Sequence, residues 1–337
     1  MEKEPLFTSN PENIEIHRII TEDLDCEYHL DNLFCLFKNS SGAYLVYSKP
    51  DKTIISYDII NNKVVKENKN AHEQIISNLR YQNLDGKDAI MSISCQDNNL
   101  KLWNFNNWEC ILNLKGVNKE CELKSACFLT DKGQSYIATS NAGLPEINNL
   151  EALEQIKIFD LKGKKVKEIN DSKDNTFLID TFHDDKTSKI YLVTCNFNNL
   201  KSYDFNENKL FHLYKESEGK SHFSMAIFKD GDVNKLISSS FDSNVRIWNF
   251  NTGELLKIIK VYHDFIYGIC LWNSKYLFVG ALKKEVLLVN LDEGKVVKTI
   301  EQYHSFNQTL KKANIPDLGD CLFIKNMRGI YLLKLNA

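Results

Sequence analysis

The stretch "SNVRIWNFNTGELLKIIK", residues 243–260, contains the pattern from which the fold can be built up. It opens with a small polar turn and alternates apolar and polar residues up to Trp248. It then turns through Asn-Thr-Gly and enters a second alternating run. Alternation with a period of two is typical of a half-buried strand, and Asn and Gly tolerate the positive φ that a tight hairpin needs. The stretch predicts two antiparallel strands and their turn.

The same pattern recurs along the chain, each time with an aromatic or apolar residue followed by Asp, Asn or Lys. The pairs are Tyr57-Asp58, Trp103-Asn104, Phe159-Asp160, Tyr203-Asp204, Trp248-Asn249, Val289-Asn290 and Leu333-Lys334, spaced by 41 to 56 residues. Two more apolar stretches lie upstream of each pair, so each unit predicts four strands. One four-stranded sheet cannot bury both of its faces, but seven packed radially can. The chain is therefore predicted to be all-β, a seven-bladed β-propeller of four-stranded antiparallel blades.

Four strands per unit, with an aromatic-Asp/Asn pair ending the third, resemble the WD-repeat family of β-propellers from about residue 13 onward. The resemblance implies a structural tetrad, which the fifth unit carries as His222, Ser238, Asp242 and Trp248. In such a tetrad Asp242 and Ser238 orient the imidazole, which in turn meets the indole N–H. Buried polar groups that are satisfied in this way tie two loops to the strands.

Partial tetrads are expected in other units. They comprise His72, Asp97 and Trp103 in the second unit, Asp51 in the first, and His263 and His304 in the sixth and seventh. Lys283 and Met327 stand where the last two units would carry the turn Asp. These departures predict degenerate blades within the same fold.

The N-terminal run "NIEIHRII", residues 13–20, alternates like a strand and precedes the first full unit. The resemblance implies that such a strand completes the last blade, and closing the ring in this way removes sheet edges. Residues 1–12 are expected to form a flexible tail, and residues 13–337 a single domain.

Composition limits the function classes. The 337 residues carry 42 Lys and Arg against 45 Asp and Glu, a net charge of −3 that gives no general reason to bind nucleic acid or anionic membrane. No run approaches the roughly 18 apolar residues that span a bilayer, and the first residues lack a secretory layout. The nine cysteines include no C-x-x-C pair, which predicts a reducing compartment, the cytosol.

Motifs that carry chemistry are weak. Gly219-Lys220-Ser221 resembles the end of a phosphate-binding loop, but the position that needs the first Gly is Tyr214. The run His183-Asp184-Asp185 falls where a hairpin is expected, and consecutive residues rarely converge on one metal ion. The sequence predicts no cofactor, no metal site and no catalytic residue.

The remaining candidates for a functional site are residues on the surface of the predicted propeller. In this architecture the loops between second and third strands, and those leading into the next unit, gather on one face, here called the top face. The residues just before the turn Asp are expected to project there, namely Pro50, Gln96, Asn196, Phe241, Leu282 and Asn326. Phe241 and Leu282 would form an apolar pair on adjacent blades, either an anchor for a partner or a cover over the channel rim. The insertion at 141–153 lies on the same face, as a recognition element or a neutral expansion.

These observations predict a non-catalytic, cytosolic scaffold for protein–protein interactions, which binds a peptide or partner domain on the top face as a subunit of a hetero-oligomeric complex. One alternative is a substrate receptor of a cullin-type ubiquitin ligase. That signature ends in Trp-Asp-x-Arg, whereas Asn249 and Asn251 occupy its last polar positions here. A second alternative is a propeller enzyme with acidic or histidine residues converging on the channel.

Overall fold

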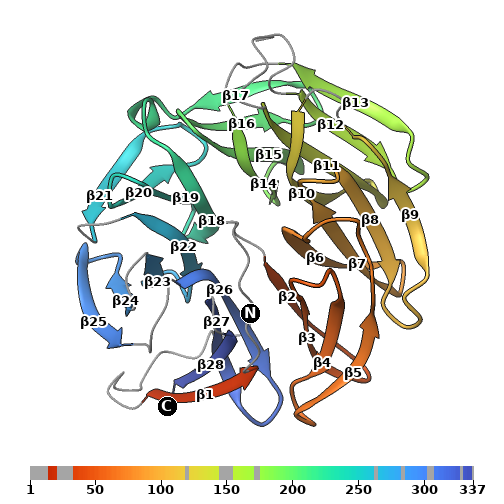
Figure 1. Ribbon diagram of the computed structural model, residues 1–337. Coiled ribbons are helices and arrows are strands. Elements are labelled where there is room, and N and C mark those ends of the chain that lie inside the picture. The colour runs from red at the N-terminus through yellow and green to blue at the C-terminus, as the bar shows by residue number, and fades with distance from the viewer. Residues whose placement is uncertain are drawn as a thin grey trace.

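The computed structural model describes residues 14–20, 33–117, 121–143, 155–170, 175–261, 265–281, 285–301, 307–326 and 329–335. These residues form an all-β, seven-bladed propeller in which each blade is a four-stranded antiparallel sheet (Figure 1). The only helix among them is one 3-10 turn, Lys215–Ser217. None of the helical segments in the described ranges is long and apolar enough to cross a membrane.

The strands follow the chain, with the innermost strand of each blade first. Blade one contains β2 (Phe34–Asn39), β3 (Gly42–Ser48), β4 (Ile54–Asp58) and β5 (Lys63–Asn68). Blade two contains β6 (Asn78–Leu84), β7 (Lys87–Ser94), β8 (Asn99–Asn104) and β9 (Cys110–Leu114). Blade three contains β10 (Cys121–Asp131), β11 (Gln134–Gly143), β12 (Gln155–Asp160) and β13 (Lys165–Asn170). Blade four contains β14 (Thr176–Asp184), β15 (Lys189–Asn196), β16 (Leu200–Asp204) and β17 (Lys209–Leu213).

The remaining three blades continue the same order. Blade five contains β18 (His222–Asp230), β19 (Val233–Ser240), β20 (Asn244–Asn249) and β21 (Leu255–Lys260). Blade six contains β22 (Ile266–Leu271), β23 (Tyr276–Ala281), β24 (Glu285–Asn290) and β25 (Lys295–Glu301). Blade seven contains β26 (Asn307–Ile315), β27 (Gly319–Asn326), β28 (Gly329–Leu335) and β1 (Ile14–Ile20).

The predicted closure is confirmed. β1 pairs antiparallel with β28, in a register that sets Ile14 opposite Leu335 and Ile16 opposite Leu333, and it forms the outer strand of blade seven. The predicted strand at 13–20 matches the observed one to a single residue. The tail expected for residues 1–12 lies outside the described residues. Of the insertion at 141–153, the first three residues extend β11 and the rest is not described.

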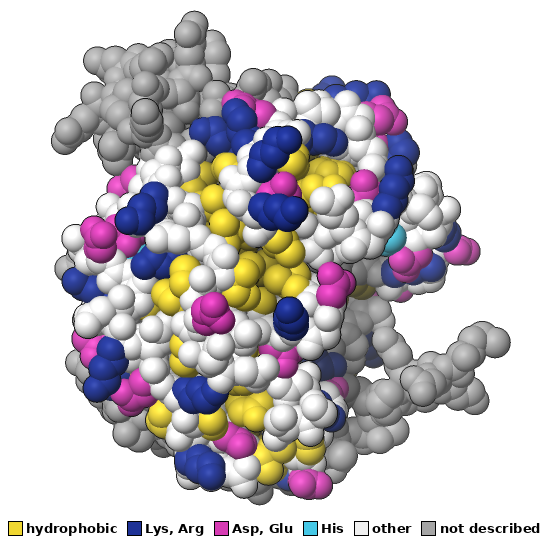
Figure 2. All heavy atoms as spheres, turned by 90° about the vertical axis from the view of Figure 1, so that its right-hand side faces the viewer, with side chains coloured by type: hydrophobic (Ala, Val, Ile, Leu, Met, Phe, Trp, Pro, Cys, Tyr) yellow, Lys and Arg dark blue, Asp and Glu magenta, His cyan; other side chains and the backbone are white. Residues whose placement is uncertain are grey.

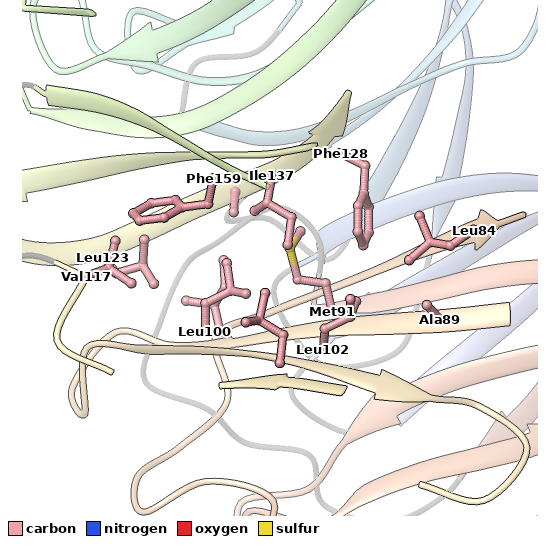
Figure 3. Packing of buried hydrophobic residues seen from close by; sticks show 13 residues of the cluster. Leu84, Ala89, Met91, Leu100, Leu102, Val117, Leu123, Phe128, Ile137 and Phe159 are labelled. Carbon is pink, nitrogen blue, oxygen red and sulfur yellow. The ribbon is translucent and has the colours of Figure 1, made fainter. Parts of the chain in front are cut away.

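Apolar clusters fill the space between neighbouring blades. Between blades two and three, Met91 and Leu102 pack against Phe128 and Ile137 (Figure 3). Similar clusters lie between each of the other neighbouring pairs. The ring is completed where Leu45 of blade one shares a cluster with Phe323 of blade seven. Each blade therefore buries both of its faces only because it has two neighbours.

In six of the seven recurring pairs, the second residue has a local structural role. Its side-chain oxygen accepts the backbone N–H two or three residues further on, which turns the chain from the third strand into the fourth. The bonds run from Ile60 to Asp58 (3.0 Å), Asn106 to Asn104 (2.9 Å), Lys162 to Asp160 (2.9 Å), Glu207 to Asp204 (2.9 Å), Asn251 to Asn249 (3.0 Å) and Asp292 to Asn290 (3.0 Å). Asp and Asn are interchangeable here because both supply this acceptor. Blade seven, whose outer strand is β1, has Lys334 instead.

Candidate functional site

The inner strands of blades four, five and six each carry a β-bulge at their second residue. The register of β14, β18 and β22 against its neighbour shifts there, which leaves Phe177, Phe223 and Tyr267 as the extra residues. A bulge turns the extra side chain away from the regular alternation of its strand. Because the shift recurs at the same place, three aromatic side chains lie at the same end of neighbouring blades.

These side chains belong to a row of packed rings. Phe177 and Phe223 stack with centroids 4.9 Å apart, Phe223 and Phe241 at 4.0 Å, and Phe241 and Phe265 at 4.4 Å. The first two pairs lie within 23° of parallel, and the third is tilted by 33°. With its two flanking rings, the aromatic row comprises Phe177, Phe197, Phe223, Phe241, Phe265 and Tyr267.

One side of the aromatic row packs on the buried Tyr267, and the rings at its two ends are exposed. Tyr267 is buried and meets Phe223 and Phe241 at steep angles, with centroids 5.9 and 5.5 Å away. At one end Phe197, 48% exposed, lies 6.1 Å from Phe177; at the other end Phe265 is 40% exposed. Large apolar side chains that are exposed together, on a packed base, are typical of an interaction surface.

Backbone hydrogen bonds hold the turns that carry the row. The Phe197 N–H donates to the Asn175 carbonyl over 2.8 Å, and the Phe241 N–H donates to the Ser221 carbonyl over 3.1 Å. Both bonds join the turn after the second strand to the segment that leads into the same blade. The rings are thus presented by turns that are already tied down, so a partner meets a surface with little conformational freedom to lose.

The acidic residue next to Phe241 is neutralised. Asp242 accepts two hydrogen bonds from the Arg246 guanidinium, one of them 3.0 Å long from Nη1 to Oδ1. Burial would raise the pKa of the Asp242 carboxyl, but the hydrogen bonds and charge of Arg246 outweigh it and lower that pKa to about 2. The pair adds no net charge beside the aromatic row.

Phe241, predicted from the sequence as a partner-binding residue, lies in the middle of the aromatic row. Its expected neighbour Leu282 lies outside the described residues, so that half of the apolar pair stays a prediction. Pro50 and Gln96, the matching positions in blades one and two, are exposed in their turns. The structure does not bring these two residues to the aromatic row.

Asn196 and Asn326 differ from the expectation that they project outward. Both are buried. The Asn196 side chain accepts a hydrogen bond from the Thr176 hydroxyl over 2.8 Å and donates one to the Asn199 side chain over 2.7 Å. The Asn196 amide thus closes its own turn with hydrogen bonds, whereas a phenyl ring such as Phe241 has no polar group with which to do so.

Five rings of the aromatic row were missed by the sequence reasoning. A signal for three of them exists, since Phe177, Phe223 and Tyr267 fall at corresponding places in consecutive units, near the start of the predicted first strand. Regular alternation would send such side chains into the sheet face. Only the bulge makes them members of a surface, and a bulge has no clear sign in one sequence.

The tetrad in blade two is complete. His72 Nδ1 lies 3.2 Å from Asp97 Oδ2, and His72 Nε2 lies 2.8 Å from Ser92 Oγ. The Trp103 indole N–H donates to the same Ser92 oxygen over 2.8 Å. Burial opposes ionisation of Asp97, but its hydrogen bond and attraction to His72 prevail and lower the carboxyl pKa. Ser92, which the sequence reasoning omitted, is the residue through which His72 and Trp103 are connected.

Blade five, expected to carry the full tetrad, has only part of it. The Trp248 indole N–H donates to Ser238 Oγ over 3.1 Å, as expected. Asp242, however, pairs with Arg246 instead of the imidazole. Neither ring nitrogen of the buried His222 makes a hydrogen bond of normal geometry with a described residue. The reason is that the Arg246 guanidinium can donate two parallel hydrogen bonds to the Asp242 carboxylate, whereas the His222 imidazole could donate only one, so Arg246 takes the place of the imidazole.

Asp51 of blade one acts within its own turn. Its carboxylate accepts the Thr53 N–H over 3.0 Å. His263 and His304, the other expected members, lie outside the described residues, as do Lys283 and Met327.

One charge pair spans the inner strands of blades two and four. Arg80 of β6 donates from Nη1 to Asp180 Oδ1 over 3.1 Å and from Nη2 to the Ile179 carbonyl over 2.9 Å. The Asp180 carboxylate on β14 is therefore engaged in an ion pair with Arg80.

The hairpin residue His183 is exposed and lies 3.4 Å from Asp185. Within the described ranges, no three His, Cys, Asp or Glu side chains group so that they could hold a metal ion.

No protein-family model matches the chain, and no curated protein matches it. The propeller architecture therefore rests on the strand order, the registers and the packing between blades.

Proposed function

We propose that this chain is a non-catalytic scaffold of the WD-repeat type, which binds a protein partner on its top face at the aromatic row. The observation that carries the proposal is the stack of Phe177, Phe223, Phe241 and Phe265 across three blades, with exposed rings at both ends. The complete tetrad of blade two, and the Asp or Asn that closes the turn between the third and fourth strands in six blades, support the WD-repeat assignment.

Aromatic side chains are suited to this role. They bring a large apolar area with few rotatable bonds, and for this reason they are frequent at the centres of protein interfaces. Here the rings are held by each other and by bonded turns, so binding costs little side-chain entropy. The proposed mechanism is rigid display: the closed ring fixes the rings in place, and the partner supplies the complementary surface.

The stacking geometry also limits which chemical groups of a partner can bind to the aromatic row. Nucleic acid bases and cationic groups bind to the open faces of aromatic rings. In the aromatic row the faces of Phe223 and Phe241 are directed at each other and at the rings beside them. What the row presents are ring edges and the two terminal rings, Phe197 and Phe265. We therefore propose a partner segment with apolar or aromatic anchors, within a cytosolic hetero-oligomeric complex.

The decisive experiment compares Phe265→Glu with Val297→Glu. Both side chains are 40% exposed and both belong to blade six, but Phe265 lies in the aromatic row and Val297 lies on β25. A photo-crosslinking residue placed at 265 and at 297 identifies any protein in direct contact, and affinity purification from the native cell measures its stoichiometry.

We expect one stoichiometric partner that crosslinks from position 265, not from 297, and that is lost from Phe265→Glu alone. A partner retained equally by both variants would place the binding surface elsewhere. If wild-type protein yields no partner, the scaffold proposal itself fails.

A further inference from the structure

Phe241 joins blade five to blade six within the aromatic row. Its ring stacks on Phe223 of blade five and contacts Phe265 and Tyr267 of blade six, with centroids 4.4 and 5.5 Å away. Phe223 and Tyr267 belong to strands, whereas Phe241 belongs to the turn between β19 and β20. A strand residue is fixed by its ladder of hydrogen bonds, but a turn residue depends on the bonds that hold its turn. The position of Phe241 therefore depends on how this turn is held.

The turn is built around the side chain of Asp242, the residue after Phe241. The Asp242 carboxylate accepts the Asn244 N–H over 3.2 Å, and the Asp242 carbonyl accepts the Asn244 side-chain amide over 3.2 Å. Ser243 has a φ of 67°, in the left-handed region, and its N–H donates to the Ser240 carbonyl over 3.2 Å. The direction in which Phe241 leaves the turn is thus coupled to the place of the neighbouring carboxylate.

Arg246 ties this carboxylate to β20. Its guanidinium donates from Nη1 to Asp242 Oδ1 over 3.0 Å and from Nη2 to Asp242 Oδ2, so both carboxylate oxygens are held. The Arg246 side chain is buried, and its backbone lies opposite Ser238 in the ladder between β19 and β20. A bidentate pair has a defined geometry, and a buried pair is screened little by solvent. The pair therefore connects the turn to the strand framework of blade five.

The equivalent turn of blade two is held in another way. Its Asp97 bonds to His72, in the segment that leads into the blade. Lys101, which has the same spacing from its turn Asp as Arg246, donates to a backbone carbonyl instead. The residue before Asp97 is Gln96, so this turn carries no ring. A lysine at position 246 is thus expected to leave the carboxylate, because a single ammonium group does not reproduce the two parallel bonds of a guanidinium.

We infer that Arg246 is a positioning residue of the partner site, which holds Phe241 in the aromatic row through the Asp242 carboxylate. The role in binding rests on the proposed function, whereas the positioning itself is a property of the protein without a partner. A turn that is fixed before binding has little conformational freedom to lose, so loosening it lowers the affinity for the partner.

The test places para-fluorophenylalanine at position 265, where the ring contacts Phe241, and records its fluorine NMR resonance in the full chain without a partner. The variants are Arg246→Lys, Asp242→Asn and the two combined. Asn249→Ala is the matched control, since the Asn249 side chain closes the turn at the opposite end of β20. Thermal unfolding verifies that every variant folds. Photo-crosslinking from position 265 then compares Arg246→Lys with Asn249→Ala in the presence of the partner.

We expect Arg246→Lys and Asp242→Asn each to shift the fluorine resonance. The double variant should shift it no further, because both substitutions break the same pair. Asn249→Ala should leave the resonance in place. The crosslinking yield should fall at least about fivefold in Arg246→Lys and stay at the wild-type level in Asn249→Ala.

A fluorine resonance that Arg246→Lys leaves unchanged overturns the inference. An equal shift in Asn249→Ala also overturns it, because the row would then respond to any weakening of blade five. A shifted resonance with full crosslinking removes the role of Arg246 in binding. If wild-type protein has no partner, the proposed function fails, while the fluorine resonance still decides whether Arg246 positions Phe241.

Discussion

Phe223 and Phe241 stack with centroids 4.0 Å apart and planes within 16° of parallel, which joins the bulge of β18 to the turn that follows β19. Phe223 also meets Phe177 of blade four and Tyr267 of blade six. One side chain of blade five thus contacts the inner strands of both neighbouring blades. The aromatic row is a proposed binding surface, and it is also part of the packing that holds three blades in register.

Replacing Phe223 by Ala should therefore cost more stability than replacing Phe265. Phe223 stacks within the row, while Phe265 lies at its exposed end. We expect losses of about 2 kcal/mol for Phe223→Ala and about 0.5–1 kcal/mol for Phe265→Ala. Urea unfolding measures both values. Equal losses would mean that the stacking in the middle of the row contributes nothing of its own.

Ser92 and Ser238 hold equivalent places but should differ in importance. Ser92 Oγ bridges Trp103 and His72, while Ser238 Oγ bonds Trp248. Ser92→Ala leaves both an indole N–H and an imidazole nitrogen buried without this partner, a cost of about 2–3 kcal/mol; Ser238→Ala should cost about 1 kcal/mol. The two free energies of unfolding, measured side by side, test the difference. A larger loss for Ser238→Ala would contradict the network described for blade two.

His222 should make the protein sensitive to acid. Burial, followed by the positive charge of Arg246, lowers its pKa from the usual 6.5 to about 4. Below pH 6.5 the unfolded chain binds a proton at this residue that the folded protein does not bind. Stability is then fully present above about pH 6.5 and declines as the pH falls toward 4, by as much as about 3 kcal/mol in total.

The variant His222→Leu removes this contribution. Its melting temperature should change less between pH 7 and pH 4.5 than that of wild type, whatever its value at pH 7. His183→Leu is the control, because His183 is an exposed hairpin residue and should leave the wild-type pH dependence in place. If His222→Leu follows the wild-type profile, another group governs the acid response.

Ring closure by β1 predicts a difference between two truncations. Removing residues 1–20 deletes the strand that pairs with β28 and leaves that strand as an unprotected edge, so the melting temperature should fall by several degrees or more. Removing residues 1–12 keeps β1 intact and should leave the melting temperature close to that of the full chain. Identical melting of the two truncated proteins would show that β1 is dispensable.

The fold could be predicted because its signal is repeated and local. Six of the seven units carry a residue such as Asp58 or Asn249 that closes a turn with its own side chain, and this requirement is visible in any one of these copies. Strand alternation between these turns supplies the rest. Seven copies make the pattern robust to the loss of individual residues, such as the Val289 that replaces the aromatic residue in blade six.

The sites were harder to predict because they depend on small shifts of register. Ser238 lies four residues before Asp242, but Ser92 lies five before Asp97, so an alignment on the Asp passes over Ser92. Likewise, the Arg246 fork reaches Asp242, whereas Lys101, at the same place in blade two, donates to the Ala71 carbonyl over 2.6 Å and leaves Asp97 to His72. Because Arg246 and Lys101 have the same spacing from the turn Asp, spacing alone does not predict which of them pairs with it. The difference lies in the shape of the cation, a planar guanidinium in Arg246 and a single ammonium group in Lys101.

The pairing of β1 with β28 also sets an order of events during synthesis. β1 leaves the ribosome before any other described strand of the ring, yet the strand with which it pairs is β28, which is translated after all of the other described strands. Blades one to six can assemble while the chain is still growing, but blade seven cannot. A ribosome that stalls before Gly329 would release a product with an open seam, exposing the β27 edge to quality control. The ring can therefore close only after the last blade has been translated.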